Sequence, residues 1–272
     1  MSDVDYRAEA MAAGARVRRY GSWYVAEHRL RAMKAFAVTL LVLMFANPVL
    51  YLLALGLGLA MLVQQQVGGV SYLVFVAPGL LAGAAFIGGA EESTYPVLTG
   101  FKFNPTFFAM AASPVSPRQV GNGVFIGTAV RVIPTVVAYY GVMLLFGAVP
   151  SSMGAFTILT ASLVGMAAAA LVTWYTSTVE EDKGQMAVIM RFIVMPLFLF
   201  SGTFFPLAQL PLYLQWIGWI SPLWHANELG RVLSYGMAEP VWLTALHVVV
   251  LVVLLVIGIL GTHRVMERRL AK

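Results

Sequence analysis

The sequence predicts an all-α integral membrane protein with six transmembrane helices. Hydrophobic residues make up 60% of the 272-residue chain and charged residues only 11%, whereas a soluble domain carries about 25% charged residues. Six apolar stretches are long enough to cross a bilayer as helices, which takes about 20 residues each. They cover residues 36–63, 73–90, 121–147, 156–178, 186–205 and 241–262. Strict alternation of apolar and polar residues is absent, which disfavours a membrane β-barrel.

Residues 1–35 precede the first span and are expected to form a cytoplasmic region. They contain no continuous apolar segment of the kind found in a signal peptide. Apolar and basic residues recur on opposite sides of a helix, which predicts an interfacial amphipathic helix lying on anionic headgroups. The apolar set is Trp23, Ala26, Leu30, Met33 and Ala37, and the polar set is His28, Arg29, Arg31 and Lys34. A cytoplasmic helix packed on protein is the alternative.

The placement of basic residues predicts the orientation. Seven of the 17 Lys and Arg residues precede the first span, and four follow the last one in the basic tail at residues 263–272. Lys102, Arg118, Lys183 and Arg191 flank the connections after the second and fourth predicted spans. By the positive-inside rule, both termini of the 36–262 transmembrane domain are cytoplasmic. Arg231 is then the one clearly external basic residue.

A short helix is predicted in the connection after the second span. Asn104 suits an N-cap, Pro105 the first helical position, and Pro114 ends the helix after Ser113. Its apolar side chains, if exposed to water, would form an unfavourable patch, so they are expected to dock against a partner. These side chains are Phe107, Phe108 and Met110. The alternative is a helix packed on its own bundle.

Three polar or polarisable residues fall inside predicted spans. Arg131 lies about 15 Å along the third span, at 1.5 Å per residue, so it is placed near mid-membrane. An intramembrane arginine is costly and often functional. The alternatives are an ion pair with Glu91 or Glu92, or a side chain that reaches the interface. Asn47, with Tyr51 one turn on, lines a transport path or joins neighbouring helices.

An aromatic hairpin is predicted between the fifth and sixth spans. Its prolines divide it into two short helices, and its aromatic residues, including Trp216 and Trp219, suit the headgroup level of the outer leaflet. His225, Glu228 and Arg231 are spaced three residues apart and share a helical face. We expect a structural network that holds the hairpin, or contact with a polar or sugar-bearing headgroup. An acid–base catalytic site is disfavoured because no motif supplies a nucleophile.

Several functions are disfavoured by missing motifs. The chain has no cysteine, and its four histidines show no metal-ligand spacing, so no metal site is expected. It also lacks the Gly-Lys pair of a Walker A motif, so no ATPase is encoded in it.

The run SGTFFPL at 201–207, followed by LP, an aromatic helix, PL and a histidine, resembles the signature of type-2 ABC exporter permeases and of their NodJ-like branch. The resemblance covers about residues 29–264 and is sharpest at 195–231. In that family, a helix matching the one at Phe107 inserts into a groove of a separate ATPase, and SPVSPRQ at 113–119, with Arg118, belongs to this region.

The resemblance implies the rest of the assembly. Two permease subunits, as a homodimer or heterodimer, pair with two ATPase subunits that bind ATP and Mg; the permease itself holds no cofactor and contacts membrane lipids but no nucleic acid. It implies export of a lipo-oligosaccharide, glycolipid or other lipid-linked saccharide across a bacterial cytoplasmic membrane. Alternatives are hydrophobic drug or antibiotic efflux, an ATPase-independent secondary transporter, and a membrane-embedded lipid-modifying enzyme.

Overall fold

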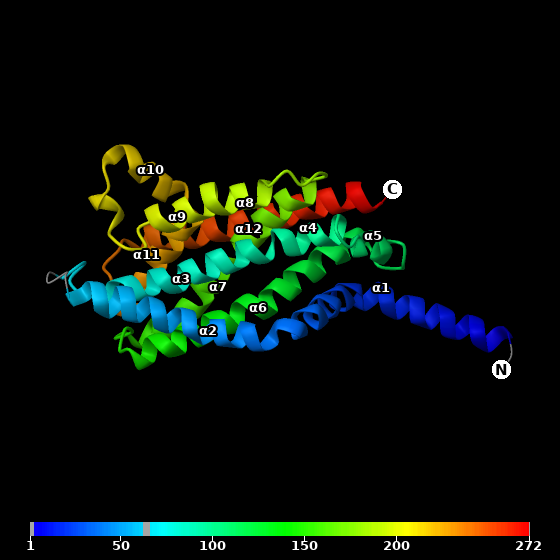
Figure 1. Ribbon diagram of the computed structural model, residues 1–272, viewed down its shortest axis with the longest axis horizontal. Helices are drawn as coiled ribbons and strands as arrows, with labels where there is room; N and C mark the ends of the chain where they lie inside the picture. Colours follow the sequence, from blue (N-terminus) through cyan, green and yellow to red (C-terminus); the bar gives the residue numbers. More distant parts are fainter. Residues whose placement is uncertain (1–2, 62–65, 272) are drawn as a thin grey trace.

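The computed structural model describes residues 3–61 and 66–271, and helices account for nearly all of this part of the chain. The long helices lie along one axis, and both termini lie toward the same end (Figure 1). Within these two ranges, five helical segments are long and apolar enough to cross a membrane, and a sixth apolar segment is shorter. The predicted all-α membrane fold is therefore confirmed. The cytoplasmic placement of the termini stays a prediction.

The first helices form one long arm. α1 (Asp3–Met33) continues through a 3₁₀ turn, η1 (Lys34–Phe36), into α2 (Ala37–Tyr51). A π-helical stretch, η2 (Leu52–Gly58), and a second 3₁₀ turn, η3 (Leu59–Met61), follow. Pro48 lies inside α2 without ending it. The predicted end of this span at residue 63 lies outside the described residues.

The second half of α1 packs on protein, which is the alternative stated above. Gly21, Val25, Ala26 and Arg29 are buried, and a Cβ at Gly123 of α6 (Pro117–Leu145) would overlap Val25. The prediction that Arg29 lies on the headgroup side is therefore wrong, because its guanidinium has a buried carboxylate partner described below. Trp23 is exposed.

Three helices form the closely packed centre of the bundle: α3 (Tyr72–Glu92), α7 (Thr157–Thr178) and α12 (Val241–Leu270). Small residues let their backbones touch. A Cβ on Gly89 of α3 would overlap the carbonyl oxygen of Gly165 in α7, and a Cβ on Gly258 of α12 would lie 2.6 Å from the carbonyl carbon of Ala170 in α7. α7 is preceded by a 3₁₀ turn, η4 (Ser152–Phe156).

The fifth predicted span ends earlier than expected. α8 (Gln185–Ile189), a π-helical turn η5 (Met190–Val194) and α9 (Met195–Phe200) form one short apolar helix. The chain bends after Phe200, where Gly202 adopts a left-handed φ of 71° that other residues rarely tolerate. The predicted helical continuation to residue 205 is therefore wrong.

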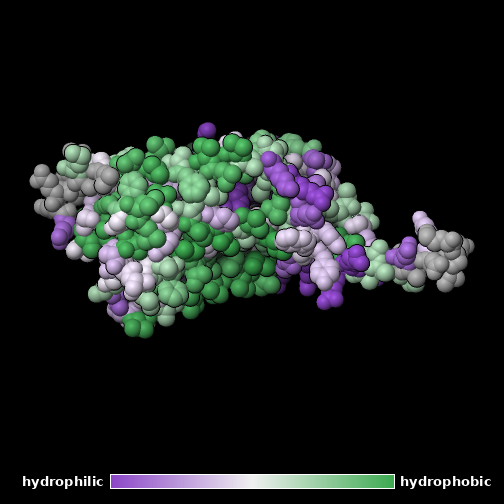
Figure 2. Space-filling model, turned by 90° about the horizontal axis from the view of Figure 1, so that it is seen from below, coloured by the Kyte–Doolittle hydropathy of each residue, from purple (hydrophilic) through white to green (hydrophobic). Residues whose placement is uncertain are grey.

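The remaining elements lie at the two ends of the bundle. α4 (Tyr95–Phe101) and α5 (Thr106–Ala111) connect α3 to α6 near the end where the termini lie. At the opposite end, a 3₁₀ turn η6 (Leu207–Gln209), α10 (Leu212–Ile220) and α11 (Pro222–Tyr235) form the predicted hairpin. Figure 2 shows a broad hydrophobic face on the bundle, with hydrophilic side chains gathered where α1 projects.

Candidate functional site

The aromatic hairpin is fixed to the bundle by a buried polar cluster. Asn227 of α11 is fully buried and donates from Nδ2 to the carbonyl oxygen of Ser201 at 2.9 Å and to Thr203 Oγ1 at 3.2 Å. Ser201 Oγ donates to Ser221 Oγ at 2.6 Å, and Ser221 also caps the start of α11. The bend after α9 is thus held by side chains of α11. Sequence reasoning missed Asn227, although an amide on an otherwise apolar helix face was a usable signal.

Arg231 and Glu228 form a buried ion pair. Arg231 has 1% of its side-chain surface exposed, and its Nη1 lies 2.6 Å from Glu228 Oε1. Its Nη2 donates to the carbonyl oxygen of Gly202, and its guanidinium carbon lies 4.0 Å from the centre of the Phe75 ring. The predicted local pairing is confirmed for these two residues. Arg231 is, however, not an accessible external charge.

His225 belongs to a different network. Its Nδ1 lies 2.6 Å from Nδ1 of His247 in α12, its Nε2 lies 3.2 Å from the carbonyl oxygen of Trp219, and His247 Nε2 lies 3.1 Å from Glu239 Oε1. The Trp219 carbonyl can only accept, so His225 carries its proton on Nε2 and accepts from His247. The three residues therefore do not form one network. His225 points toward α12, whereas Arg231 points toward α3.

Burial fixes the charge of His225. It lies in α11, which has 14 residues and is too short to span a bilayer. Burial, and then the neighbouring His247, lower its pKa from 6.5 to about 4. His225 is therefore neutral at physiological pH. Among the described residues, no group of three side chains could hold a metal ion.

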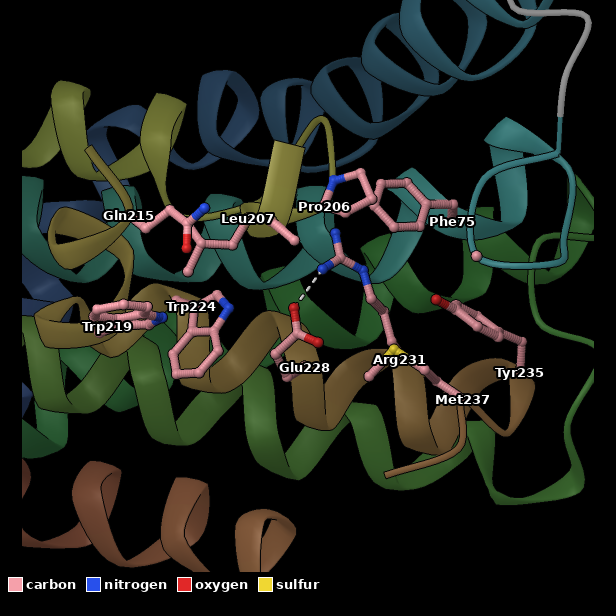
Figure 3. Close-up of a pocket in the computed structure, with 12 residues that line it drawn as sticks. Phe75, Pro206, Leu207, Gln215, Trp219, Trp224, Glu228, Arg231, Tyr235 and Met237 are labelled. Carbon is pink, nitrogen blue, oxygen red and sulfur yellow. Dashed lines mark hydrogen bonds and ion pairs between the residues drawn. The ribbon is translucent and has the colours of Figure 1, made fainter. Parts of the chain in front are cut away.

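A pocket opens between the hairpin and the start of α3 (Figure 3). Its volume is about 320 Å³. Two indole side chains, Trp219 from α10 and Trp224 from α11, lie side by side along one part of it, and the Glu228–Arg231 pair lies beside them. Trp216 lies on the same helix as Trp219 and is 53% exposed, but it is not part of the lining.

At the other end of α3, Glu92 holds two arginines. Its carboxylate pairs with Arg131 of α6 and, at 3.4 Å, with Nη2 of Arg29 from α1. Side-chain exposure is 4% for Glu92, 9% for Arg29 and 31% for Arg131. The ion-pair alternative for Arg131 is thus confirmed with Glu92. Arg29 was not foreseen as a partner, because 63 residues separate it from Glu92.

The short helix α5 differs in detail from its prediction. It begins at Thr106, so Pro105 takes the N-cap position and Asn104 precedes it, accepting at its carbonyl oxygen from Thr106 N at 2.6 Å. The prediction of Asn104 as the N-cap is wrong. The prediction placed Pro105 at the first helical position. In the structure the helix starts one residue later, at Thr106. Ser113 and Pro114 lie beyond its end at Ala111.

The apolar side chains of α5 divide between two environments. Phe107 is 3% exposed and packs edge-on against Phe101 of α4 at 5.0 Å between ring centres, over the bare backbone of Gly100. The prediction that Phe107 docks against a partner is wrong, because residues of the same chain already cover this side chain. Phe108 is 43% exposed and Met110 is partly exposed.

An apolar groove of about 410 Å³ lies beside α5. Its lining comes from α1, from α5 and from the α5–α6 connection: Val17, Tyr24, Val25, Met110, Ser113, Pro114 and Val115. Nearby, the start of α6 is closed by a capping box between Ser116 and Gln119. Arg118 Nε lies 2.5 Å from Glu267 Oε1 of α12, which ties this connection to the last helix.

The two remaining predicted residues lie on the surface of the single chain. Asn47 and Tyr51 of α2 are exposed, and Tyr51 is 44% exposed. The structure does not bring them together with Arg131 or with the hairpin. The interhelical and path-lining interpretations of these two residues therefore both stay predictions.

Comparison with known proteins agrees with this architecture. The model of the ABC-2 type transporter family matches residues 23–235. Nodulation protein J of Rhizobium leguminosarum bv. viciae is 28% identical over 236 residues, covering 84% of this chain and 86% of that protein. Nodulation protein J of Rhizobium meliloti (strain 1021) is 26% identical over 248 residues, covering 88% and 90%. No solved structure matches the chain significantly. Because the family model covers most of the described helices, this chain belongs to the ABC-2 type transporters and is a membrane permease.

Proposed function

We propose that this permease exports an amphiphile with a saccharide head, such as a glycolipid or lipo-oligosaccharide, across the cytoplasmic membrane of a bacterium. Two copies of a separate ATPase bind ATP and Mg and supply the energy, and a second permease subunit completes the path. One observation carries the proposal. The bundle has an apolar helix, α5, partly exposed at one end, and an aromatic pocket beneath the hairpin at the other end.

The end with α5 is the cytoplasmic end in this proposal. Lys102, Arg118 and the basic last turn of α12 are found there, as the positive-inside rule requires. Phe108 and the groove beside it offer apolar surface to a water-soluble partner, and exposed apolar surface of this kind favours association. α5 packs on α4 and α6 through Phe107 and its neighbours, so movement of the ATPase would be passed to the spans.

The path lies between two subunits. At the centre of a single bundle, α7 packs directly against α3 and against α12 through glycine contacts. Asn47 and Tyr51 on the exposed face of α2 would line the path together with the second and fifth spans. ATP-driven closure of the ATPases would rock the two subunits and open this path alternately to each side.

Co-purification with the ATPase encoded beside this permease tests the proposal. Phe108→Asp removes the exposed 43% of the ring, whose burial is worth about 1 kcal/mol, and adds a charge that docking would bury without a partner. Association should therefore be at least roughly tenfold weaker. Tyr213→Asp is the matched control, because Tyr213 is 73% exposed on α10 at the opposite end. Equal association of both variants with the ATPase would contradict the assignment of α5.

The transport substrate is tested with the complex of permease and ATPase reconstituted in nanodiscs. Stimulation of ATP hydrolysis by glycolipids, and not by hydrophobic drugs, is the expected result. Stimulation by drugs alone would instead support the drug-efflux alternative. Absence of any associated ATPase would refute the proposal as a whole.

A further inference from the structure

The pocket beneath the aromatic hairpin has unused hydrogen-bonding groups. Arg231 Nε and Tyr235 Oη are both buried and have no partner among the described residues, and both residues line the pocket. Glu228 uses Oε1 for Arg231, while its side chain keeps 15% of its surface exposed. Burial raises the pKa of Tyr235 to about 12, so its hydroxyl keeps the proton and can donate. Buried polar groups in native proteins are rarely left unpaired.

The rest of the lining is apolar and flat. Trp219 is 50% exposed, and its indole lies beside that of Trp224 (Figure 3). Phe75 and Leu207 complete the apolar part. The volume of about 320 Å³ is within the range of roughly 300–1,000 Å³ found for small-molecule sites, which combine apolar walls with a few placed polar groups.

The charges of the pocket exclude an anionic ligand as the preferred occupant. Arg231 is neutralised by Glu228 at 2.6 Å, so an entering phosphate or carboxylate would meet a carboxylate already in place. A purely apolar ligand would leave the Tyr235 hydroxyl and Arg231 Nε unpaired, at a cost in affinity. A neutral ligand with both apolar faces and hydroxyl groups fits the two sets of contacts.

A pyranose ring has this character. Its C–H faces are apolar and match the flat indole surfaces, while its hydroxyls both donate and accept hydrogen bonds. The outer surface of α10 next to the pocket is apolar, with Leu212, Tyr213 and Trp216 exposed. A hydrocarbon tail attached to the sugar would lie on this surface.

We propose that this pocket binds the neutral saccharide head of an amphiphile, with Trp219 stacking on the sugar and Glu228 and Tyr235 bonding to its hydroxyls. The inference rests on the proposed export function and assigns residues to its substrate. It makes Tyr235, which sequence reasoning did not single out, a specificity-determining residue.

Equilibrium binding to the permease alone, in nanodiscs and without ATP, tests the proposal. The probes are dodecyl β-maltoside, dodecyl phosphocholine with the same tail, and free maltose; the permease is purified in a detergent without a sugar head. We expect saturable binding of the maltoside, at least tenfold weaker binding of dodecyl phosphocholine in the pocket, and weaker binding of maltose because it lacks the tail.

Three variants separate the pocket from the fold. Trp219→Ala should weaken maltoside binding at least tenfold, whereas the matched control Trp23→Ala, at a similarly exposed tryptophan on α1 away from the pocket, should change it less than twofold. Tyr235→Phe should weaken binding about fivefold without lowering Tm, because the hydroxyl has no hydrogen-bond partner among the described residues.

Four results would overturn the proposal. In the first two, the maltoside does not bind, or dodecyl phosphocholine binds with the same dependence on Trp219. In the other two, the two tryptophan variants have equal effects, or maltose binds as tightly as the maltoside. A permease that still co-purifies with its ATPase but shows any of these results keeps its proposed export function and loses only the pocket assignment.

Discussion

Replacement of Glu92 by glutamine should destabilise the permease strongly. The change keeps the size of the side chain and removes the negative charge that Arg29 and Arg131 share. At the 3.4 Å separation of Arg29 Nη2 and Glu92 Oε2, the attraction is about 5 kcal/mol for an effective dielectric constant near 20. Removing one partner of a buried pair costs about 3–5 kcal/mol, because the other charge stays buried.

The lower end of that range is expected for Glu92→Gln. The glutamine oxygen can still accept one hydrogen bond, and Arg131, at 31% exposed, recovers part of its hydration. A loss of about 3 kcal/mol corresponds to a more than 100-fold change in the unfolding equilibrium constant. Unfolding in mixed micelles with increasing dodecyl sulfate, followed by tryptophan fluorescence, measures this free energy.

The adjacent Glu91 provides the matched control. It is exposed at the same end of α3, and its charge acts on Arg131 without a direct ion pair. Glu91→Gln should therefore change the free energy of unfolding by less than about 1 kcal/mol. Adding Arg29→Met to Glu92→Gln should cost less than the sum of the two single changes, with a coupling of about 1–3 kcal/mol. A Glu92→Gln variant as stable as Glu91→Gln would refute the reasoning.

Three further predictions concern stability. Gly89→Ala should cost about 1–3 kcal/mol, because its Cβ meets the backbone of α7, whereas Gly88→Ala, where a Cβ meets open space, should be tolerated in the same unfolding assay. Asn227→Ala should cost about 1–3 kcal/mol and make the 201–205 bend more sensitive to protease than in wild type; equal cleavage rates would contradict its anchoring role. Because the pKa of His225 is lowered to about 4 from 6.5, the unfolded state binds this proton first, and stability should fall as the pH drops from about 6.5 through 4. A His225→Gln variant with the same pH dependence would show that another group is responsible.

Features that depend on residues close together in the sequence were predicted correctly, whereas features that depend on contacts between separate helices were not. Hydropathy and proline positions are local signals, and they predict the helical spans and α10. The three-residue spacing of Glu228 and Arg231 is equally local and predicts their pairing. The register of α5 and the burial of Phe107 depend on Gly100 and Phe101, which come together only when α4 folds back on α5. Local sequence therefore indicated an apolar helix but not which of its faces was free.

Partners from distant helices were the main omission. His225 contacts His247 and, through it, Glu239, and both come from the region around the start of α12. Periodicity places His225 on one face with Arg231 but does not show which helix each side chain meets. Likewise, the sequence does not show that the Tyr235 hydroxyl is buried without a hydrogen-bond partner among the described residues, because this depends on the pocket formed around it.

The glycine contacts of the central helices imply a division between static and mobile parts of the permease. Where the backbones of α3, α7 and α12 touch, no layer of side chains is available to rearrange, so these helices must move together. The π-helical turns η2 and η5 lie in the first and fifth spans instead, and such turns often mark positions of functional adjustment. Because the chain has no native cysteine, introduced pairs can lock chosen contacts without interference. A disulfide between α3 and α7 should leave transport intact, and one that fixes α2 to α6 should stop it.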